Sequence, residues 1–301
     1  MLTCERRAQI VISATSLTDW QTYITGDNVS VLLYVVDGRT VMGVTRLGLH
    51  DIVYIVCRES SEIIRFDAIT HERLTDITVR GLRWPEDIVA CQQTAQLYVA
   101  DDPPVRTGAA DCIWRISSDG EDVKRLLSKS PLDRFRPHTL SVTSARPLMT
   151  SSFYKNQLRQ FDAFGDELRC VRLPRYLKPQ HAVESPAGTF IVSHFNEQLE
   201  QCQVSEVNTG GQVMRQFSGS RLLPLGSTAH VAVDSRGNIF VADEGNGCIL
   251  LLNSELTLRR VIIDEHQLNY KKPRRLCYIE QSGQLLVGLR RDVAVFDVLR
   301  R

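Results

Sequence analysis

Short apolar segments recur along this chain at a nearly constant spacing. A run of four mostly apolar residues occurs six times, at 53–56, 97–100, 148–151, 190–193, 239–242 and 285–288. A second apolar segment follows each run and ends in a short polar residue. These second segments start at residues 63, 113, 158, 204, 249 and 293, which gives steps of 50, 45, 46, 45 and 44 residues. Such a regular period predicts a repeat architecture of six similar units.

Two further segments complete each unit. An apolar segment precedes each four-residue run and is joined to it by a turn, in which Gly188, Gly237 and Gly283 hold equivalent places. A fourth segment alternates apolar and charged residues, as a half-solvated outer strand does; examples are 73–79, 167–173 and 258–263. Four strands in about 45 residues match one blade of a β-propeller. The sequence therefore predicts an all-β fold: a six-bladed β-propeller of four-stranded antiparallel blades.

The two ends of the repeat region complement each other. The sixth unit stops after its third strand, whereas the apolar segment 28–36 is a strand without a unit of its own. We predict that residues 29–36 pair with the last blade and close the ring. Residues 28–301 then form the propeller domain, and 1–27 form an N-terminal extension whose structure the pattern does not assign.

One unit carries a recognisable motif. The stretch HVAVDSRGNIFVADEGNGCIL at 230–250 resembles an NHL repeat, the module of the C-terminal propeller of tripartite-motif proteins, and 97–101 with 112–117 form a second copy. The other four units depart from the motif, because they replace its Asp with Cys57, Ser152, His194 or Leu289. The resemblance implies a recognition propeller that binds a protein or an RNA hairpin on one face. In that family catalysis belongs to an upstream RING domain, whose Cys and His spacing this sequence lacks.

Composition narrows the choice of partners. Lys and Arg number 36 against 35 Asp and Glu, so no overall field attracts DNA or an anionic membrane. With 43% apolar residues the chain can bury a large core, but its longest apolar runs are far too short to cross a bilayer. Eight scattered cysteines form no C-x-x-C pair, and no secretory pattern follows Met1. We expect a monomeric cytoplasmic protein without a cofactor and with neither a DNA nor a membrane partner.

The residue that enters each innermost strand should line the mouth of the central channel. Aligned by the repeat, these positions are Thr40, Asp87, Thr139, His181, His230 and Arg275. His181 and His230 with Asp87 suggest a metal site or an acid/base pair, similar to that of propeller lyases and lactonases. The Arg275 cation at the same channel mouth argues against a metal site there. In the alternative interpretation the two histidines hydrogen-bond to backbone or water.

A binding surface is expected where loop content varies most. The loops between the second and third strands of all blades define what we call the loop face. Its candidate binding residues, with three from the channel mouth, are Tyr154, Lys155, Asn156, Phe195, Asn196, Asn246, Arg290, His181, His230 and Arg275. We expect non-catalytic binding of a protein partner there, because exposed aromatic side chains are typical interface anchors.

Two other functions remain open. An RNA-binding propeller would use Lys155, Arg159, Arg290, Arg291 and the basic residues of 271–275 beside stacking aromatics. A metal-dependent lyase or hydrolase would use the central channel. No catalytic residue is assigned, since nucleophile, phosphate-loop and zinc-protease motifs are missing from the sequence.

Overall fold

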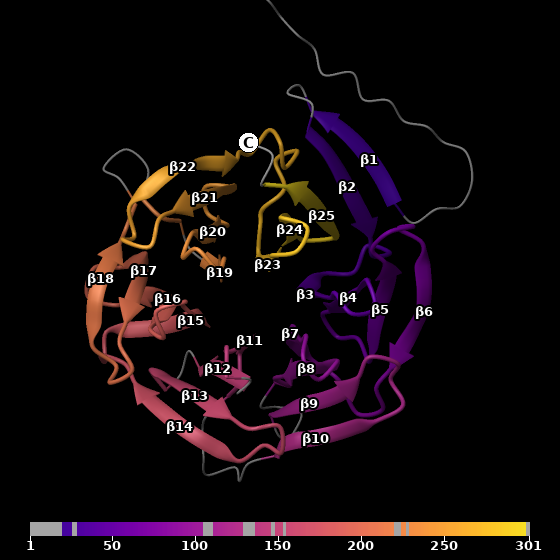
Figure 1. The fold of residues 1–301 in the computed structure, drawn as a ribbon, viewed down its shortest axis with the longest axis horizontal. Helices are drawn as coiled ribbons and strands as arrows, with labels where there is room; N and C mark the ends of the chain where they lie inside the picture. Colours follow the sequence, from indigo (N-terminus) through magenta and orange to yellow (C-terminus); the bar gives the residue numbers. More distant parts are fainter. Residues whose placement is uncertain are drawn as a thin grey trace, which may run out of the picture.

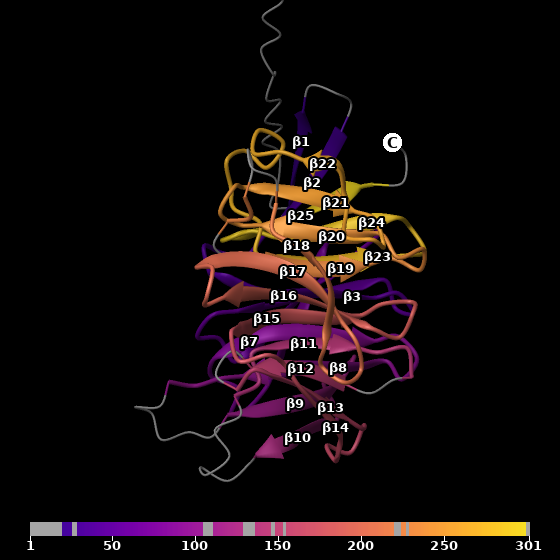
Figure 2. The same ribbon diagram turned by 90° about the vertical axis from the view of Figure 1, so that its left-hand side faces the viewer.

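Six β-sheets stand around a central axis like the blades of a wheel (Figure 1). The computed structural model describes residues 20–25, 29–104, 111–128, 136–145, 148–152, 155–219, 224–226 and 229–298. Each of the five four-stranded sheets runs from an innermost to an outermost strand in chain order. Figure 2 shows the wheel from its side, with connections at both faces. The predicted six-bladed all-β propeller is confirmed. Among the described residues no helix is long and apolar enough to span a membrane.

Five blades contain four strands each. Blade 1 consists of β3 (Val41–Leu47), β4 (Ile52–Cys57), β5 (Glu62–Asp67) and β6 (Arg73–Thr78). Blade 2 consists of β7 (Pro85–Cys91), β8 (Gln96–Asp101), β9 (Cys112–Ser117) and β10 (Val123–Ser128). Blade 3 consists of β11 (Thr139–Val142), β12 (Leu148–Ser152), β13 (Gln157–Phe161) and β14 (Glu167–Arg172). Blade 4 consists of β15 (Leu177–Glu184), β16 (Phe190–Asn196), β17 (Gln201–Val207) and β18 (Val213–Phe217). Blade 5 consists of β19 (Ala229–Val233), β20 (Ile239–Asp243), β21 (Cys248–Leu252) and β22 (Leu258–Ile263).

The sixth blade combines strands from both parts of the chain. Its inner strands are β23 (Arg275–Ile279), β24 (Gln284–Gly288) and β25 (Asp292–Asp297). Outside them lie β2 (Val29–Val35) and then β1 (Trp20–Thr25). β2 runs antiparallel to β25, with Leu32 opposite Val295 and Tyr34 opposite Val293. β1 falls in the segment that the sequence pattern left unassigned.

Apolar side chains pack between neighbouring blades and form the core. Blade 1 contributes Tyr54 and Ile63 to one buried cluster, and blade 2 contributes Val99 and Trp114 to the same cluster. Each β-strand supplies alternate side chains to the blade before it and the blade after it, as its period of two requires. The six repeated units therefore pack sheet against sheet around the ring.

The Asp of the NHL-like motif has a structural role. Asp101 Oδ1 accepts a hydrogen bond of 2.7 Å from Trp84 N in the connection that enters blade 2. Asp243 Oδ1 accepts an equivalent bond of 3.0 Å from Gly226 N at the entry to blade 5. The carboxylate at the end of the second strand thus fixes the incoming connection.

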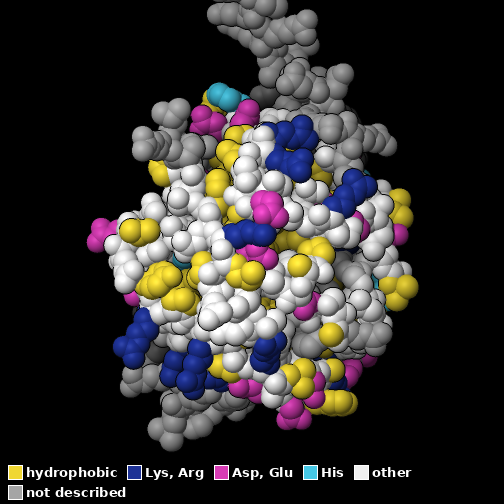
Figure 3. All heavy atoms as spheres, turned by 60° about the vertical axis from the view of Figure 1, so that its left-hand side comes forward, with side chains coloured by type: hydrophobic (Ala, Val, Ile, Leu, Met, Phe, Trp, Pro, Cys, Tyr) yellow, Lys and Arg dark blue, Asp and Glu magenta, His cyan; other side chains and the backbone are white. Residues whose placement is uncertain are grey.

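The outermost strands of the five four-stranded blades share an irregularity. Each of the pairs β5–β6, β9–β10, β13–β14, β17–β18 and β21–β22 contains a register shift. On this outer wall Leu168, Met214 and Val261 are exposed. Figure 3 shows apolar, basic and acidic side chains interspersed over one side of the molecule. No single chemistry dominates the side seen there.

Candidate functional site

The innermost strands place one equivalent side chain per blade at the channel. In the sheet registers Asp87 pairs with Ala100, and His230 pairs with Ala242. Thr139, His181 and Arg275 hold the same position in their blades. Five of the six predicted channel positions are therefore equivalent in the structure.

The prediction for blade 1 was wrong. Thr40 precedes β3, and the residue that pairs at the equivalent place, opposite Val56, is Gly43. The register of β3 shifts between Val41 and Gly43, so counting along the repeat placed the position too early. A Cβ atom on Gly43 would lie 2.6 Å from the backbone nitrogen of Ile88. Glycine is needed here because β3 and β7 approach so closely.

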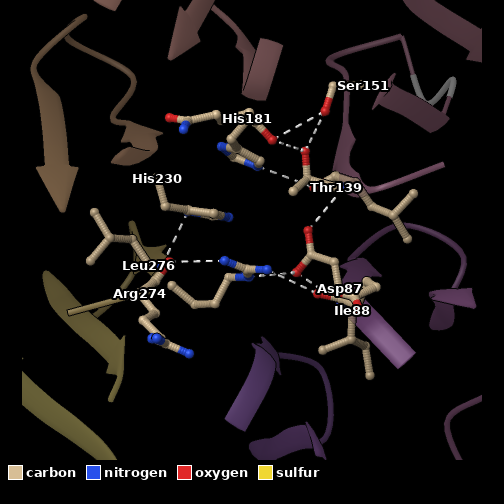
Figure 4. A network of polar contacts seen from close by, with 12 residues as sticks. Asp87, Ile88, Thr139, Ser151, His181, His230, Arg274 and Leu276 are labelled. Carbon is tan, nitrogen blue, oxygen red and sulfur yellow. Dashed lines mark hydrogen bonds and ion pairs between the residues drawn. The ribbon is translucent and has the colours of Figure 1, made fainter. Parts of the chain in front are cut away.

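The channel side chains bond each blade to the next one. Asp87 Oδ2 accepts a 2.8 Å hydrogen bond from Leu140 N. Thr139 Oγ1 donates a 2.8 Å bond to Gln180 O. Figure 4 shows Asp87 and Thr139 reaching toward the channel from separate strands. These bonds end on the backbone beside the equivalent residue of the following blade.

The two histidines continue this series. His181 Nδ1 accepts from Val231 N at 3.4 Å, and His230 Nδ1 accepts from Leu276 N at 3.2 Å. Because each Nδ1 accepts, the ring proton is on Nε2. His181 Nε2 donates it to Leu140 O at 3.3 Å. His230 Nε2 is buried and has no hydrogen-bond partner among the described residues.

Arg275 continues the series past blade 1. Its Nη2 donates a 3.0 Å hydrogen bond to Glu86 O in blade 2, and its Nε lies 3.8 Å from Asp87 Oδ1. Since Gly43 offers no side chain at the blade 1 position, the guanidinium of blade 6 bonds directly to blade 2. The channel residues thus form one continuous set of contacts around the ring.

Asp87, His181 and His230 offer three ligand atoms within 4.8 Å of one another. The two imidazole rings are stacked, with centroids 3.5 Å apart and planes inclined by 18°. A nitrogen lone pair lies in its ring plane, so lone pairs of nearly parallel stacked rings do not converge on one ion at about 2.1 Å. Asp87 also accepts from Ile88 N at 2.9 Å, which engages its second oxygen. The arrangement fits hydrogen bonding to backbone and does not fit a metal shared by both histidines.

A cavity of about 320 Å³ lies at the mouth of the channel. Besides the two histidines, its wall includes Arg58, Glu86, His138, Gln180 and Glu244. Burial raises the pKa of the Glu86 carboxyl, while Arg275 and Arg58 act in the opposite direction. Glu86, His138 and Gln180 each directly precede a channel position in the chain. Their place directly before a channel position is a signal in the sequence, but a repeat pattern with one channel residue per blade does not include it.

Three asparagines predicted to bind a partner are used by the fold. Asn156 Nδ2 donates to Arg175 O at 2.9 Å, which holds the connection into blade 4. Asn196 is buried and donates to Gln203 Oε1 at 2.9 Å. Asn246 Nδ2 donates to Pro224 O at 2.8 Å. Their amides stabilise loops, and their predicted binding role stays a prediction.

The other loop candidates differ in accessibility. Phe195 is half-buried and packs against the apolar cluster between blades 4 and 5, so it is not a free anchor. Lys155 is half-buried, whereas Arg290 is exposed. Tyr154 lies outside the described residues.

Ion pairs neutralise much of the basic patch predicted for RNA. Arg274 Nε lies 2.7 Å from Glu244 Oε1, and Lys271 pairs with Asp292. Arg159 Nη1 lies 3.3 Å from Glu167 Oε2. Lys272 Nζ donates to Gly245 O at 3.0 Å. These cations are therefore already engaged within the molecule.

The buried histidines predict that stability falls as the pH decreases. Burial lowers the pKa of His181 to about 3, and of His138 and His194 to about 4. Between those values and about 6.5 the unfolded chain binds more protons, so stability is lost as the pH falls from about 6.5 to 4. Asp87, Asp102 and Glu86 oppose this trend, because burial raises the pKa of these carboxyls, to about 6 for Asp87 and to about 7 for Asp102. Burial also lowers the pKa of His230 and His71, so the histidines outnumber the carboxyls.

Thermal unfolding at several pH values tests this expectation. His138→Gln is the matched variant, because the ring of His138 forms no hydrogen bond in the described structure. Its melting temperature should fall less steeply than that of the parent protein on acidification. A melting temperature independent of pH between about 7 and 4.5 would contradict the buried, neutral state of these rings.

Comparison with known proteins identifies the architecture. No protein-family model matches the sequence, and no curated protein matches it. Among solved structures, a gluconolactonase from Xanthomonas campestris aligns with a TM-score of 0.66 and 11% identity, covering 93% of this chain and 95% of that one. A virginiamycin B lyase from Staphylococcus aureus aligns with a TM-score of 0.62 and 10% identity, covering 90% and 100%. A streptogramin B lyase aligns with a TM-score of 0.61 and 9% identity, covering 88% and 96%.

This chain is a six-bladed β-propeller. At such low identity the likeness concerns the fold alone. These neighbours do not single out the NHL repeats that the motif at 230–250 resembles, so that finer resemblance stays a prediction.

Proposed function

We propose that this propeller is a non-catalytic recognition module that binds a protein partner through its loop face. The observation that carries the proposal is that the side chains at the channel are hydrogen-bonded to the backbone of other blades. Asp87, Thr139 and His181 are committed to backbone hydrogen bonds between blades. Groups that hold a ring together in this way are poorly placed to exchange protons or to hold a substrate.

The thiols support the same proposal. Burial raises the pKa of Cys57, Cys112 and Cys248 to about 12, and that of Cys202 to about 11. A thiol with a raised pKa is a weak nucleophile at neutral pH. All seven cysteines in the described part of the chain are unpaired, which agrees with a reducing, cytoplasmic compartment.

The loop face is suited to recognition because it is preorganised. The amides of Asn156, Asn196 and Asn246 fix its turns, and pairs such as Arg274–Glu244 connect neighbouring blades. A surface held in this way loses little conformational entropy when a partner docks. The resemblance to NHL repeats points in the same direction.

Site-specific photocrosslinking tests the proposal. A photoreactive amino acid is placed at exposed loop-face positions, Glu59 or Glu197, and at exposed positions of the opposite face, Ala187 or Arg236. We expect protein crosslinks from the loop-face positions that survive ribonuclease treatment. The positions on the opposite face serve as the matched control.

Two results would contradict the proposal. Crosslinks that arise equally from both faces would remove the special role of the loop face. Metal-dependent turnover of gluconolactone by the purified protein, the reaction type suggested by the name of one structural neighbour, would favour an enzyme.

A further inference from the structure

Five exposed arginines lie along one sector of the loop face. Arg58 lies in the β4–β5 loop, Arg80 and Arg83 lie in the β6–β7 connection, and Arg290 and Arg291 lie in the β24–β25 loop. We call this set the arginine arc. It spans blades 6, 1 and 2, which contain β25, β3 and β7 and lie next to one another in Figure 1.

Backbone hydrogen bonds hold the three segments of the arginine arc side by side. Val41 N donates to Arg290 O at 3.0 Å, and Arg58 N donates to Thr40 O at 2.8 Å. The β24–β25 and β4–β5 loops therefore meet at the start of β3. Next along the arc, Val79 N donates to Ser61 O at 2.8 Å, which joins the β4–β5 loop to the β6–β7 connection. Residues far apart in the sequence thus form one continuous surface.

The cations of the arginine arc have no ion-pair partner among the described residues. None of its five side chains forms an ion pair or a hydrogen bond with a described residue. Two carboxylates lie at the starts of the strands that follow these segments: Asp292 pairs with Lys271, and Glu86, half-buried in the cavity wall, interacts electrostatically with Arg275 and Arg58. Glu59 is exposed. Five cations therefore face solvent beside one exposed carboxylate.

The fold gains nothing evident from this arrangement, because neighbouring like charges repel each other. Other loop-face cations show the opposite behaviour: Arg274 and Lys178 each have a carboxylate partner, Glu244 and Glu197. All five members of the arc are arginine, whose planar guanidinium binds a carboxylate through two parallel hydrogen bonds. We infer that the partner contributes an acidic segment, rich in Asp or Glu, that lies along the arginine arc. This inference rests on the protein-binding function proposed above.

An acidic peptide fits this surface better than single-stranded nucleic acid. Recognition of unpaired bases depends on aromatic side chains that stack on them. The three segments present no exposed aromatic residue in the described structure, and Trp84, next to Arg83, is half-buried. The formal net charge of the chain is only +1, so attraction of anions is confined to this sector.

Fluorescence anisotropy with a labelled peptide of about eight glutamates tests the inference on the full chain. We expect the peptide to bind, with an affinity that falls between about 50 and 200 mM salt because the contacts are electrostatic. The variant Arg58→Gln/Arg83→Gln/Arg290→Gln should bind at least about tenfold more weakly at an unchanged melting temperature, since exposed ion pairs each contribute modestly. The control Arg236→Gln/Arg259→Gln/Arg260→Gln removes the same charge from exposed positions outside the arc and should keep the parent affinity.

Three outcomes would overturn the inference. Equal weakening in both triple variants would mean that net charge alone governs binding. Tighter binding of a labelled uridine octamer, with the same dependence on the arc, would make the arc a nucleic-acid surface. Failure of the glutamate peptide to bind, while loop-face crosslinks to a protein persist, would refute the acidic chemistry and leave the proposed function intact. Loss of those crosslinks in the photocrosslinking experiment would instead count against the proposed function itself.

Discussion

Removal of residues 1–36 is expected to cause aggregation and loss of the cooperative unfolding transition. The deletion takes away β2, whose pairing with β25 extends from Leu32 opposite Val295 to Val35 opposite Asp292. It also removes Tyr34 and Val36, which are fully buried against blade 1, where the Tyr34 ring lies 4.7 Å from that of Phe66. An unpaired strand edge next to exposed apolar surface is a template for association with other chains.

Size-exclusion chromatography and thermal unfolding measure this effect. A chain that begins at residue 20 is the control, because it keeps both β1 and β2 and should behave as the full chain. A smaller change to the same contact is the substitution Tyr34→Ala. It should lower the free energy of unfolding by about 3–5 kcal/mol, as loss of a large buried aromatic side chain does. If the 1–36 deletion stays monomeric with its melting temperature unchanged, β2 does not close the ring.

Replacement of Gly43 with alanine is expected to destabilise the propeller by about 1–3 kcal/mol or more, the cost of forcing an extra methyl group into a packed core. The added Cβ would lie 2.6 Å from Ile88 N and 3.1 Å from the carbonyl carbon of Asp87. Both are backbone atoms, so relief requires movement of β7 relative to β3. That movement would also disturb Asp87, which bonds blade 2 to blade 3.

Denaturant unfolding compares this variant with a matched glycine replacement. In Gly48→Ala the new Cβ would meet only the Gln92 side chain, at 3.4 Å, which is ordinary contact. The change in unfolding free energy should therefore be small for Gly48→Ala and large for Gly43→Ala. Equal effects of the two substitutions would show that β3 and β7 are not as tightly packed as described.

The architecture was predictable because a repeated pattern reports on backbone arrangement many times over. A spacing near 45 residues indicates four strands per unit in every blade, so an error in one unit does not change the count. Gly43 was not predictable in the same way. A glycine has no side chain to signal its position, and the register shift in β3 moved it away from the expected place.

The loop residues show a second limit of the sequence. Asparagine is typical both of turns and of binding surfaces, so the pattern alone did not separate the two roles of Asn156 and Asn246. Their hydrogen bonds to Arg175 O and Pro224 O depend on connections from other parts of the chain. Likewise, the pairing of Arg274 with Glu244, thirty positions away, decides whether a cation is free. Only the three-dimensional arrangement distinguishes such a neutralised cation from Arg58, which forms no ion pair with a described residue.

The register shifts in the outermost strands limit how this protein meets other molecules. An intruding strand needs an unbroken row of N–H and C=O groups to join a sheet, and each of these five perimeter strands interrupts that row. The outer edges of these five blades are therefore poor templates for a strand from another copy. From these five blades we therefore expect contacts with other proteins to form at the two flat ends, where side chains rather than backbone determine which partner is accepted.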